Sequence, residues 1–207
     1  GGAKTHVLSL LQTLSRTIDV TMVCFMEGPF AQEARELGIP TEVYPGWNLP
    51  RILRLLKKKI RQEGYDLIHC HGARGNLMGV LLRRSTGLPV VTTVHSDYRL
   101  DYLGRPFSRI SYGTINTLAL RLVDYRIGVS DAMVDLLIAR GFNPDKLFPL
   151  YNGIDFTLHP PAMPRLEYLR SLGLQADEDT VAVGIAARLN PVKDIATLIR
   201  GFARAHR

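Results

Sequence analysis

Short apolar segments rich in β-branched residues alternate along the chain with longer segments whose apolar residues recur at helical spacing. The segment Val90–Val94 consists of β-branched residues and contains no charge, with Val90, Val91 and Val94 apolar, as is typical of strands buried on both faces of a sheet. Such alternation predicts an α/β fold with a parallel, Rossmann-like sheet and crossover helices. The predicted strands are Val20–Phe25, Thr41–Tyr44, Leu67–His71, Val90–Val94, Tyr125–Val129, Leu147–Tyr151 and Val181–Ala186. The predicted helices are His6–Ser15, Phe30–Leu37, Leu49–Glu63, Ala73–Ser85, Pro106–Leu122, Asp131–Arg140 and Arg165–Leu172, and a last one begins near Lys193.

The composition changes after Tyr151. The segment Asn152–Pro164 contains three prolines and a glycine, which is typical of a linker. A new pattern of helix, strand and helix then starts at Arg165. We therefore predict two domains, with residues 1–158 forming the first and residues 159–207 forming the linker and the start of a second Rossmann-like domain.

The chain opens on Gly1-Gly2-Ala3, which leads directly into a predicted helix. In a Rossmann-like unit such a glycine-rich turn follows the first strand, which is central in the sheet. We expect that strand to lie outside this chain, which leaves a gap in the middle of the sheet. We also expect the second domain to be incomplete.

The bulk composition is that of a soluble globular protein, with 46% hydrophobic and 22% charged residues. The two cysteines, Cys24 and Cys70, fall inside predicted strands, and we interpret them as reduced core residues of a cytoplasmic protein. No apolar stretch approaches the roughly 18 residues that a membrane-spanning helix needs.

The net charge is +7, and it is unevenly distributed. The predicted helix Leu49–Glu63 has apolar residues on one face and a run of cations without acids. This pattern fits an ordinary docked helix, and the alternative is peripheral contact with an anionic membrane. A nucleic-acid partner is disfavoured because aromatic residues do not alternate with the cations. The cations are Arg51, Arg54, Lys57, Lys58, Lys59 and Arg61.

Histidines follow two of the predicted strands, at the edge where open α/β sheets bind their ligands. His69 and His71 project to the same side of one strand. They are too few for a metal site, and hydrogen-bonded packing is the simpler interpretation. His95 follows the next strand, and there we favour a functional role, either as a hydrogen-bond donor or, when protonated, facing a developing anion.

Two further groups suit phosphate chemistry. Arg188 lies in a loop after a predicted strand and Lys193 at the start of the next helix, an arrangement that fits a diphosphate. Gly1 and Gly2 at a helix start would let a phosphate or sugar approach the backbone. Asp177-Glu178-Asp179 matches the Asp-x-Asp pattern of metal-dependent sugar transferases, but it precedes a strand and is interpreted as solvated surface.

Taken together, these motifs resemble glycosyltransferase family four, whose members are retaining enzymes of the GT-B fold with two Rossmann-like domains. Each motif is weak alone, and the order and spacing of all six carry the resemblance. The matching pieces are Gly1-Gly2-Ala3 before a helix with His6, Asp66-Leu-Ile-His69-Cys-His71, Thr93-Val-His95, Val129-Ser130, Asn152-Gly153-Ile154-Asp155 and Arg188-Leu-Asn-Pro-Val-Lys193-Asp194.

The resemblance implies a nucleotide-diphosphate sugar as donor, a glycan or lipid-linked acceptor, and no metal or other cofactor. Arg188 and Lys193 would hold the diphosphate and stabilise the leaving group, and His95 would lie beside the transferred sugar. Synthesis of a cell-surface polysaccharide or glycolipid at the inner face of the membrane is expected by analogy. The residues expected on the substrate side are Gly1, Gly2, His71, Ser130 and Asn152.

The chain also departs from the family pattern. The Glu-x7-Glu motif of the second domain is absent, and Asp194 replaces a glycine that often follows the diphosphate lysine. We therefore expect the parent protein to be active and this fragment to be inactive. Two alternatives remain: a non-catalytic GT-B-like binding module, and a sugar-nucleotide epimerase of the same fold, which the pairing of Asn152–Asp155 with Arg188 and Lys193 disfavours.

Overall fold

The computed structural model describes residues 2–99, 113–153, 161–187, 189 and 193–205. The chain divides into two compact units, Gly1–Ile154 and Asp155–Arg207, and each is described by itself. The first unit contains, in chain order, α1 (Gly2–Leu14), β1 (Met22–Cys24), α2 (Pro29–Glu36), β2 (Thr41–Val43), α3 (Leu49–Glu63), β3 (Ile68–His71), α4 (Gly72–Thr86), β4 (Val90–Val94), α6 (Thr114–Leu122), β5 (Tyr125–Gly128), α7 (Asp131–Ala139), the short 3-10 helix η2 (Pro144–Lys146) and β6 (Leu147–Pro149).

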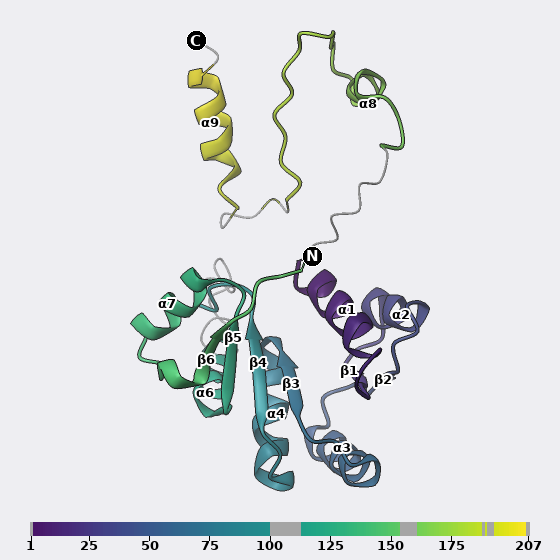
Figure 1. Ribbon diagram of the computed structural model, residues 1–207, viewed down its shortest axis with the longest axis vertical. Helices are drawn as coiled ribbons and strands as arrows, with labels where there is room; N and C mark the ends of the chain where they lie inside the picture. The colour runs from purple at the N-terminus through teal and green to yellow at the C-terminus, as the bar shows by residue number, and fades with distance from the viewer. Residues whose placement is uncertain (1, 100–112, 154–160, 188, 190–192, 206–207) are drawn as a thin grey trace. The chain divides into compact units, whose positions relative to one another are not determined.

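The predicted α/β fold with parallel strands is confirmed in the first unit (Figure 1). The six strands predicted before residue 152 are all present, with ends within two residues of the predicted ones. Part of the helix predicted at Pro106–Leu122 falls outside the described residues, and the described part is α6.

The strands form two sheets rather than one. β3, β4, β5 and β6 lie side by side in that order, and β1 pairs with β2. In the larger sheet His71 is opposite Thr93 of β4, and Val94 is opposite Gly128 of β5. All four strands run in one direction, so His71 and the residue after Val94 lie at the same carboxyl edge of the sheet.

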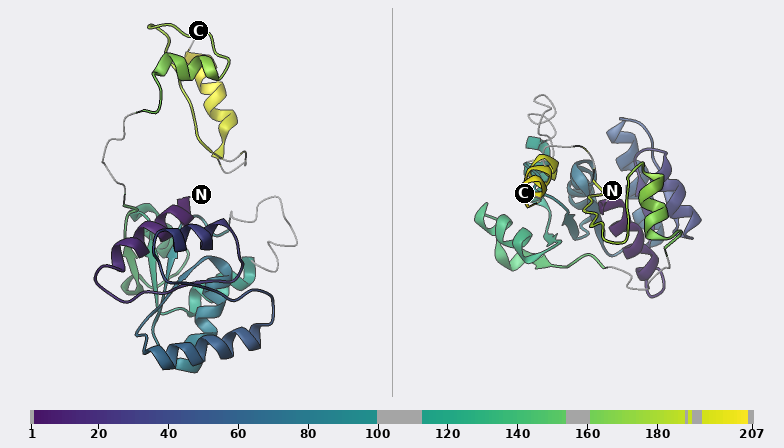
Figure 2. Two further views of the ribbon diagram at one scale, coloured as in Figure 1. Left: turned by 90° about the vertical axis from the view of Figure 1, so that its right-hand side faces the viewer. Right: turned by 90° about the horizontal axis from the view of Figure 1, so that it is seen from above.

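The two sheets lie close together because the same helices cover both. Val23 of β1 and Ile68 of β3 pack against one apolar cluster, which α3 and α4 contribute. α3 packs alongside α4 (Figure 2). At one end of the two strands Thr21 Oγ1 lies 2.6 Å from Tyr65 OH, and at the other the Arg74 guanidinium donates to the Phe25 carbonyl. That a central strand is lacking between these sheets stays a prediction.

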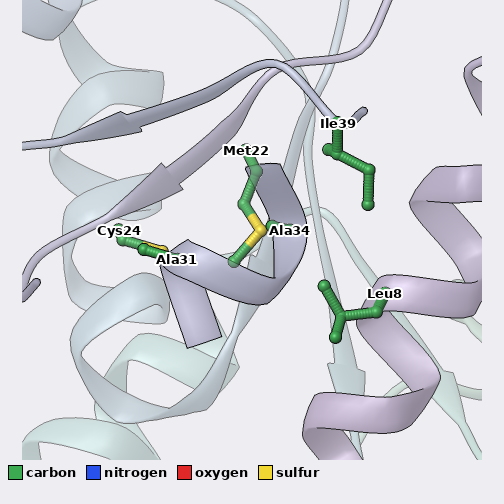
Figure 3. Close-up of a cluster of buried hydrophobic side chains, with 6 residues drawn as sticks. All are labelled: Leu8, Met22, Cys24, Ala31, Ala34 and Ile39. Atoms are coloured by element: carbon green, nitrogen blue, oxygen red, sulfur yellow. The ribbon is translucent and has the colours of Figure 1, made fainter. Parts of the chain in front are cut away.

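A second apolar cluster lies between α1, α2 and β1 (Figure 3). Ala31 and Ala34 of α2 are 1% and 0% exposed, and their small side chains let that helix approach the strand closely. The cluster fixes α1, which carries His6, against the smaller sheet. Its members are Leu8, Met22, Cys24, Ala31, Ala34 and Ile39.

α3 begins and ends at the residues that the sequence predicted. The Asn48 side chain accepts a hydrogen bond from the Arg51 backbone N–H, and Gly64 ends the helix in the left-handed conformation with φ of 70°. Ile52 and Leu56 are buried on its inner face. Of the six cations, Lys59 forms ion pairs with Glu42 and Glu63.

α4 is held against the larger sheet by a buried polar chain. The Thr92 hydroxyl of β4 lies 2.6 Å from Asn76 Oδ1, and Asn76 Nδ2 donates to Asn116 Oδ1 of α6 at 2.9 Å. All three side chains are buried. Further along α4, a Cβ added at Gly79 would lie 2.4 Å from Cys70 Sγ, so only glycine fits this contact between helix and strand.

The second unit contains α8 (Arg165–Ser171) and α9 (Ile195–Ala205). The strand predicted at Val181–Ala186 is not formed, and residues 181–187 belong to no helix or strand. The apolar side chains of this segment are largely exposed, with Val181 at 79%. A strand needs a neighbour for its backbone hydrogen bonds, and among the described residues of this unit none pairs with it.

Candidate functional site

Four histidines from three elements meet at the carboxyl edge of the larger sheet. His69 and His71 belong to the end of β3, His95 directly follows β4, and His6 lies in the second turn of α1. The ring centroids of His69 and His71 are 4.4 Å apart, as expected for side chains on the same side of one strand. The His6 ring lies 5.0 Å from the His95 ring and nearly perpendicular to it.

Hydrogen bonds fix the orientation of the rings. His71 Nδ1 lies 3.1 Å from His95 Nε2, so one of the two imidazoles donates to the other. His69 Nε2 lies 2.8 Å from the Thr93 hydroxyl. His95, predicted as a functional residue, and His71, predicted on the substrate side, are thus in direct contact.

His6 leaves one polar atom for a ligand. Its side chain is buried, and among the described residues Nε2 has no hydrogen-bond partner. A buried ring nitrogen without a partner is costly, so such an atom marks a place where a bound molecule would add a hydrogen bond. This nitrogen lies within the histidine cluster at the sheet edge where ligands bind in open α/β folds.

Burial keeps all four imidazoles neutral near pH 7. Burial, with a smaller contribution from the neighbouring histidines, lowers the pKa of His71 to about 3 and the pKa values of His69 and His95 to about 4. Burial also lowers the pKa of His6, and a hydrogen bond with Asn152 raises it by a smaller amount. Of the two roles left open for His95, the structure therefore favours the neutral hydrogen-bond donor over the cation.

The segment that follows His95 is tied to α7. Both carboxylate oxygens of Asp97 accept hydrogen bonds at 2.6 Å from the Arg140 guanidinium, which also lies over the Tyr98 ring. The guanidinium holds the pKa of Asp97 below its usual range. This bidentate ion pair fixes the backbone two residues beyond His95.

Ser130, Asn152 and Gly2, which were also predicted on the substrate side, lie around the same edge of the sheet. Ser130 follows β5 and caps α7, where its hydroxyl accepts from the Met133 N–H. Asn152 lies beyond β6 and contacts His6. Gly2 is the first residue of α1, four residues before His6, and Gly1 lies outside the described residues.

The predicted diphosphate residues do not belong to this cluster. Arg188 lies outside the described residues, and Lys193 is an exposed residue of the second unit. Asp177-Glu178-Asp179 is exposed, in line with its interpretation as solvated surface. Within the part of the chain that the structure describes, no group of three or more histidines, cysteines or acids is arranged to hold a metal ion. None of the described helices is both long and apolar enough to span a membrane.

Sequence reasoning did not select His6 or Arg140 as site residues. His6 was quoted only as part of a motif, and its distance of 89 positions from His95 gave no sign that the rings touch. The available signal was a histidine directly before the apolar Val7 and Leu8, which are buried on the same helix. Arg140 lies 43 residues from Asp97, and no pattern linked the two.

Comparison with known proteins identifies the chain's relatives. Alpha-maltose-1-phosphate synthase of Mycolicibacterium smegmatis is 28% identical over 216 aligned positions, which cover all of this chain and 54% of that protein. An Escherichia coli enzyme, UDP-Gal:alpha-D-GlcNAc-diphosphoundecaprenol alpha-1,3-galactosyltransferase, is 24% identical and is matched over 70% of this chain and 39% of its own length. The chain thus spans about half or less of the curated relatives it matches.

The fold has a solved counterpart in Anabaena HepE, crystallised in complex with UDP-glucose. The two align with a TM-score of 0.76 and 21% identity over 99% of this chain and 54% of HepE, which shows a shared GT-B fold. The model for Glycosyltransferase Family 4 matches residues 1–158, about three quarters of the chain. With its motifs, its parallel sheet and this match in agreement, the chain belongs to glycosyltransferase family 4.

Proposed function

We propose that this chain is part of a retaining glycosyltransferase that moves a sugar from a nucleotide-diphosphate sugar to a hydroxyl group of a glycan or lipid-linked acceptor. The observation that carries the proposal is the histidine cluster at the carboxyl edge of β3 and β4, with the buried Nε2 of His6 left for a ligand. Because the chain spans about half of its relatives, the activity is proposed for the whole protein.

His95 acts in this proposal as a neutral donor. Its ring, held by His71, gives a hydrogen bond to the transferred sugar or to the reacting phosphate. In this role His95 Nε2 accepts the hydrogen bond from His71 Nδ1–H, so the other ring nitrogen carries the N–H that faces the substrates. With its acceptor nitrogen occupied, His95 donates a hydrogen bond and does not take the proton of the acceptor hydroxyl. His71, Ser130 and Asn152 would contact the substrates around it.

Arg188 and Lys193 would grip the donor diphosphate from the second domain. The bond between the sugar C1 and the diphosphate oxygen breaks, and the acceptor oxygen bonds to C1 on the same face, which retains the configuration. The acceptor proton passes to the departing phosphate oxygen, and a nucleoside diphosphate leaves. No metal and no other cofactor is needed, because the two cations offset the charge of the leaving group.

The test uses the full-length protein with a panel of nucleotide-diphosphate sugars. We expect Arg188→Gln and Lys193→Gln each to reduce turnover by about a hundredfold, the scale of one lost charge-stabilising donor. Arg200→Gln, which removes an exposed cation of α9, is the matched control and should retain full turnover. Proton NMR of the product gives the anomeric configuration.

Four outcomes would contradict the proposal. Unchanged turnover in both variants would show that Arg188 and Lys193 do not bind the diphosphate. A product of inverted configuration would exclude a retaining mechanism. Donor binding without any transfer or hydrolysis in the wild type would favour the non-catalytic binding module. A nucleotide sugar epimerised at one carbon would favour the epimerase.

We propose in addition that the protein is cytoplasmic and that the outer face of α3 contacts an anionic membrane, where a lipid-linked acceptor is found. The support is a helix docked by Ile52 and Leu56 whose outer face carries the exposed cations Arg54, Lys58 and Arg61. Co-sedimentation with phosphatidylglycerol vesicles should weaken severalfold when these three cations are replaced by glutamine. Equal sedimentation of this triple variant and the wild type would refute the contact.

A further inference from the structure

A pocket of about 220 Å³ opens at the amino edge of the larger sheet, opposite the edge that carries the histidine cluster. Arg126 belongs to the start of β5, and Lys146 directly precedes β6. Arg121 comes from the last turn of α6. The lining contains these three cations and no carboxylate, and its members are Arg121, Val123, Arg126, Gly141, Phe142, Asn143 and Lys146.

Arg126 is a buried cation, with an exposed fraction of 4%. Its guanidinium donates to the carbonyls of Leu120 at 2.6 Å, Val123 at 2.7 Å and Asp124 at 3.3 Å, and so caps the carboxyl end of α6. Three of its five N–H bonds are used in this way, which leaves two. Burial of a charge in this position lowers the pKa of Arg126.

A second guanidinium is brought to the same aromatic ring. Arg121 and Arg126 lie 5.3 Å and 5.4 Å from the centroid of the Phe142 ring. Their like charges repel, and this repulsion acts to lower the pKa of Arg126, whereas the larger attraction of Asp124 acts to raise it. Lys146 adds a third positive charge at the rim of the pocket. An anion between them would relieve this repulsion.

No carboxylate of the described residues serves as that anion. The nearest candidate, Asp124, attracts Arg126 and Lys146, but its carboxylate is already held by Arg83 at 2.7 Å and by the Val90 N–H at 3.0 Å. Within the described part of the chain, Arg121, Arg126 and Lys146 form no ion pair.

We infer that this pocket, lined by Arg121, Arg126 and Lys146, binds a small phosphate-type oxyanion at a site separate from glycosyl transfer. Arginine presents planar pairs of N–H donors that match phosphate oxygens, and a buried guanidinium binds more strongly than an exposed one. Sites for drug-sized ligands measure about 300–1,000 Å³, so a pocket of this size suits a single phosphate group or ion.

The experiment is a calorimetric titration of inorganic phosphate into the full-length protein at constant ionic strength. Arg121→Gln and Lys146→Gln each remove one cation and leave the capping contacts of Arg126 intact. We expect either change to raise the Kd for phosphate about tenfold, the effect of one lost charge-assisted hydrogen bond. Arg16→Gln, an exposed cation after α1, is the control and should leave the Kd unchanged.

Lys146→Gln removes no hydrogen bond seen in the structure, so this variant keeps the test valid if Arg121→Gln fails to fold. Saturable binding that weakens in the pocket variants supports the site. The absence of saturable binding, or equal Kd values in wild type and both variants, overturns it. The titration contains no donor or acceptor. It is repeated in the Arg188→Gln protein, so that phosphate bound at the proposed donor site is distinguished from phosphate bound in this pocket.

Discussion

Acidification from pH 7 to pH 5 should destabilise the first unit through the histidine cluster. In the unfolded chain a histidine has a pKa near 6.5, whereas burial in the folded protein lowers the pKa of His69 to about 4 and of His71 to about 3. The unfolded state therefore binds more protons than the folded state between these values. Stability must rise with pH in this window, and it is lost as the pH falls below about 6.5.

The size of the effect follows from the same pKa values. At pH 5 protonation stabilises an unfolded histidine by roughly 2 kcal/mol relative to the folded one, which stays neutral. At pH 7 the same difference is about 0.2 kcal/mol. His69 and His71 together should then lower the free energy of unfolding by roughly 3 to 4 kcal/mol. His95, whose pKa is also lowered to about 4, should add to this loss. This loss is a large share of the about 5–15 kcal/mol that stabilises a typical domain.

Urea unfolding at pH 5, 6 and 7 measures this loss. Far-ultraviolet circular dichroism is the readout, because Trp47, the only tryptophan of the chain, is already 71% exposed in the folded state and its fluorescence would change little on unfolding. The His69→Gln variant keeps a donor near Thr93 but cannot titrate, and it should reduce the pH dependence by about half. Equal unfolding free energies at pH 5 and 7 would refute the reasoning, as would an unchanged slope in the variant.

Further substitutions test packing and the ion pair near the site. Gly79→Ala should lower the free energy of unfolding by about 1–3 kcal/mol because the new Cβ would lie 2.4 Å from Cys70 Sγ. Gly75→Ala in the same helix has room for the Cβ and should raise the free energy of unfolding by up to about 1 kcal/mol. Equal effects of the two changes in urea unfolding would contradict this packing. Arg140→Ala leaves the Asp97 carboxylate half-buried without its partner and should cost about 2–3 kcal/mol. In the full-length protein the same change should lower kcat more than it changes KM, and unchanged kinetics would show that the ion pair does not position His95.

The elements that the sequence predicted best are those whose signals are local. β4 was predicted to the residue because its apolar run is buried on both faces. α3 was predicted to the residue because its capping asparagine and its final glycine are adjacent to it in the chain. The strand expected at Val181–Ala186 failed for the opposite reason, since a strand depends on partners that are distant in sequence.

The candidate site was predictable in part for the same reason. His71 and His95 follow strands, and parallel strands place their carboxyl ends together, so pattern alone brought these two residues to one edge. His6 and Arg140 reach the site through tertiary packing of α1 and α7, which no local pattern encodes. The protonation state of the histidines could not be predicted from the sequence either, because the pKa of a buried group depends on its neighbours.

The polar chain from Thr92 through Asn76 to Asn116 has a consequence for the geometry of the site. A slide of α4 by one helical turn along the sheet would separate the buried amides of Asn76 and Asn116 from their partners, each at a cost of about 1–3 kcal/mol, and would leave the Thr92 hydroxyl with the Cys70 carbonyl alone. Only one alignment of this helix is therefore compatible with a dry interior. His71 immediately precedes α4, so the same alignment sets the place from which its imidazole reaches His95.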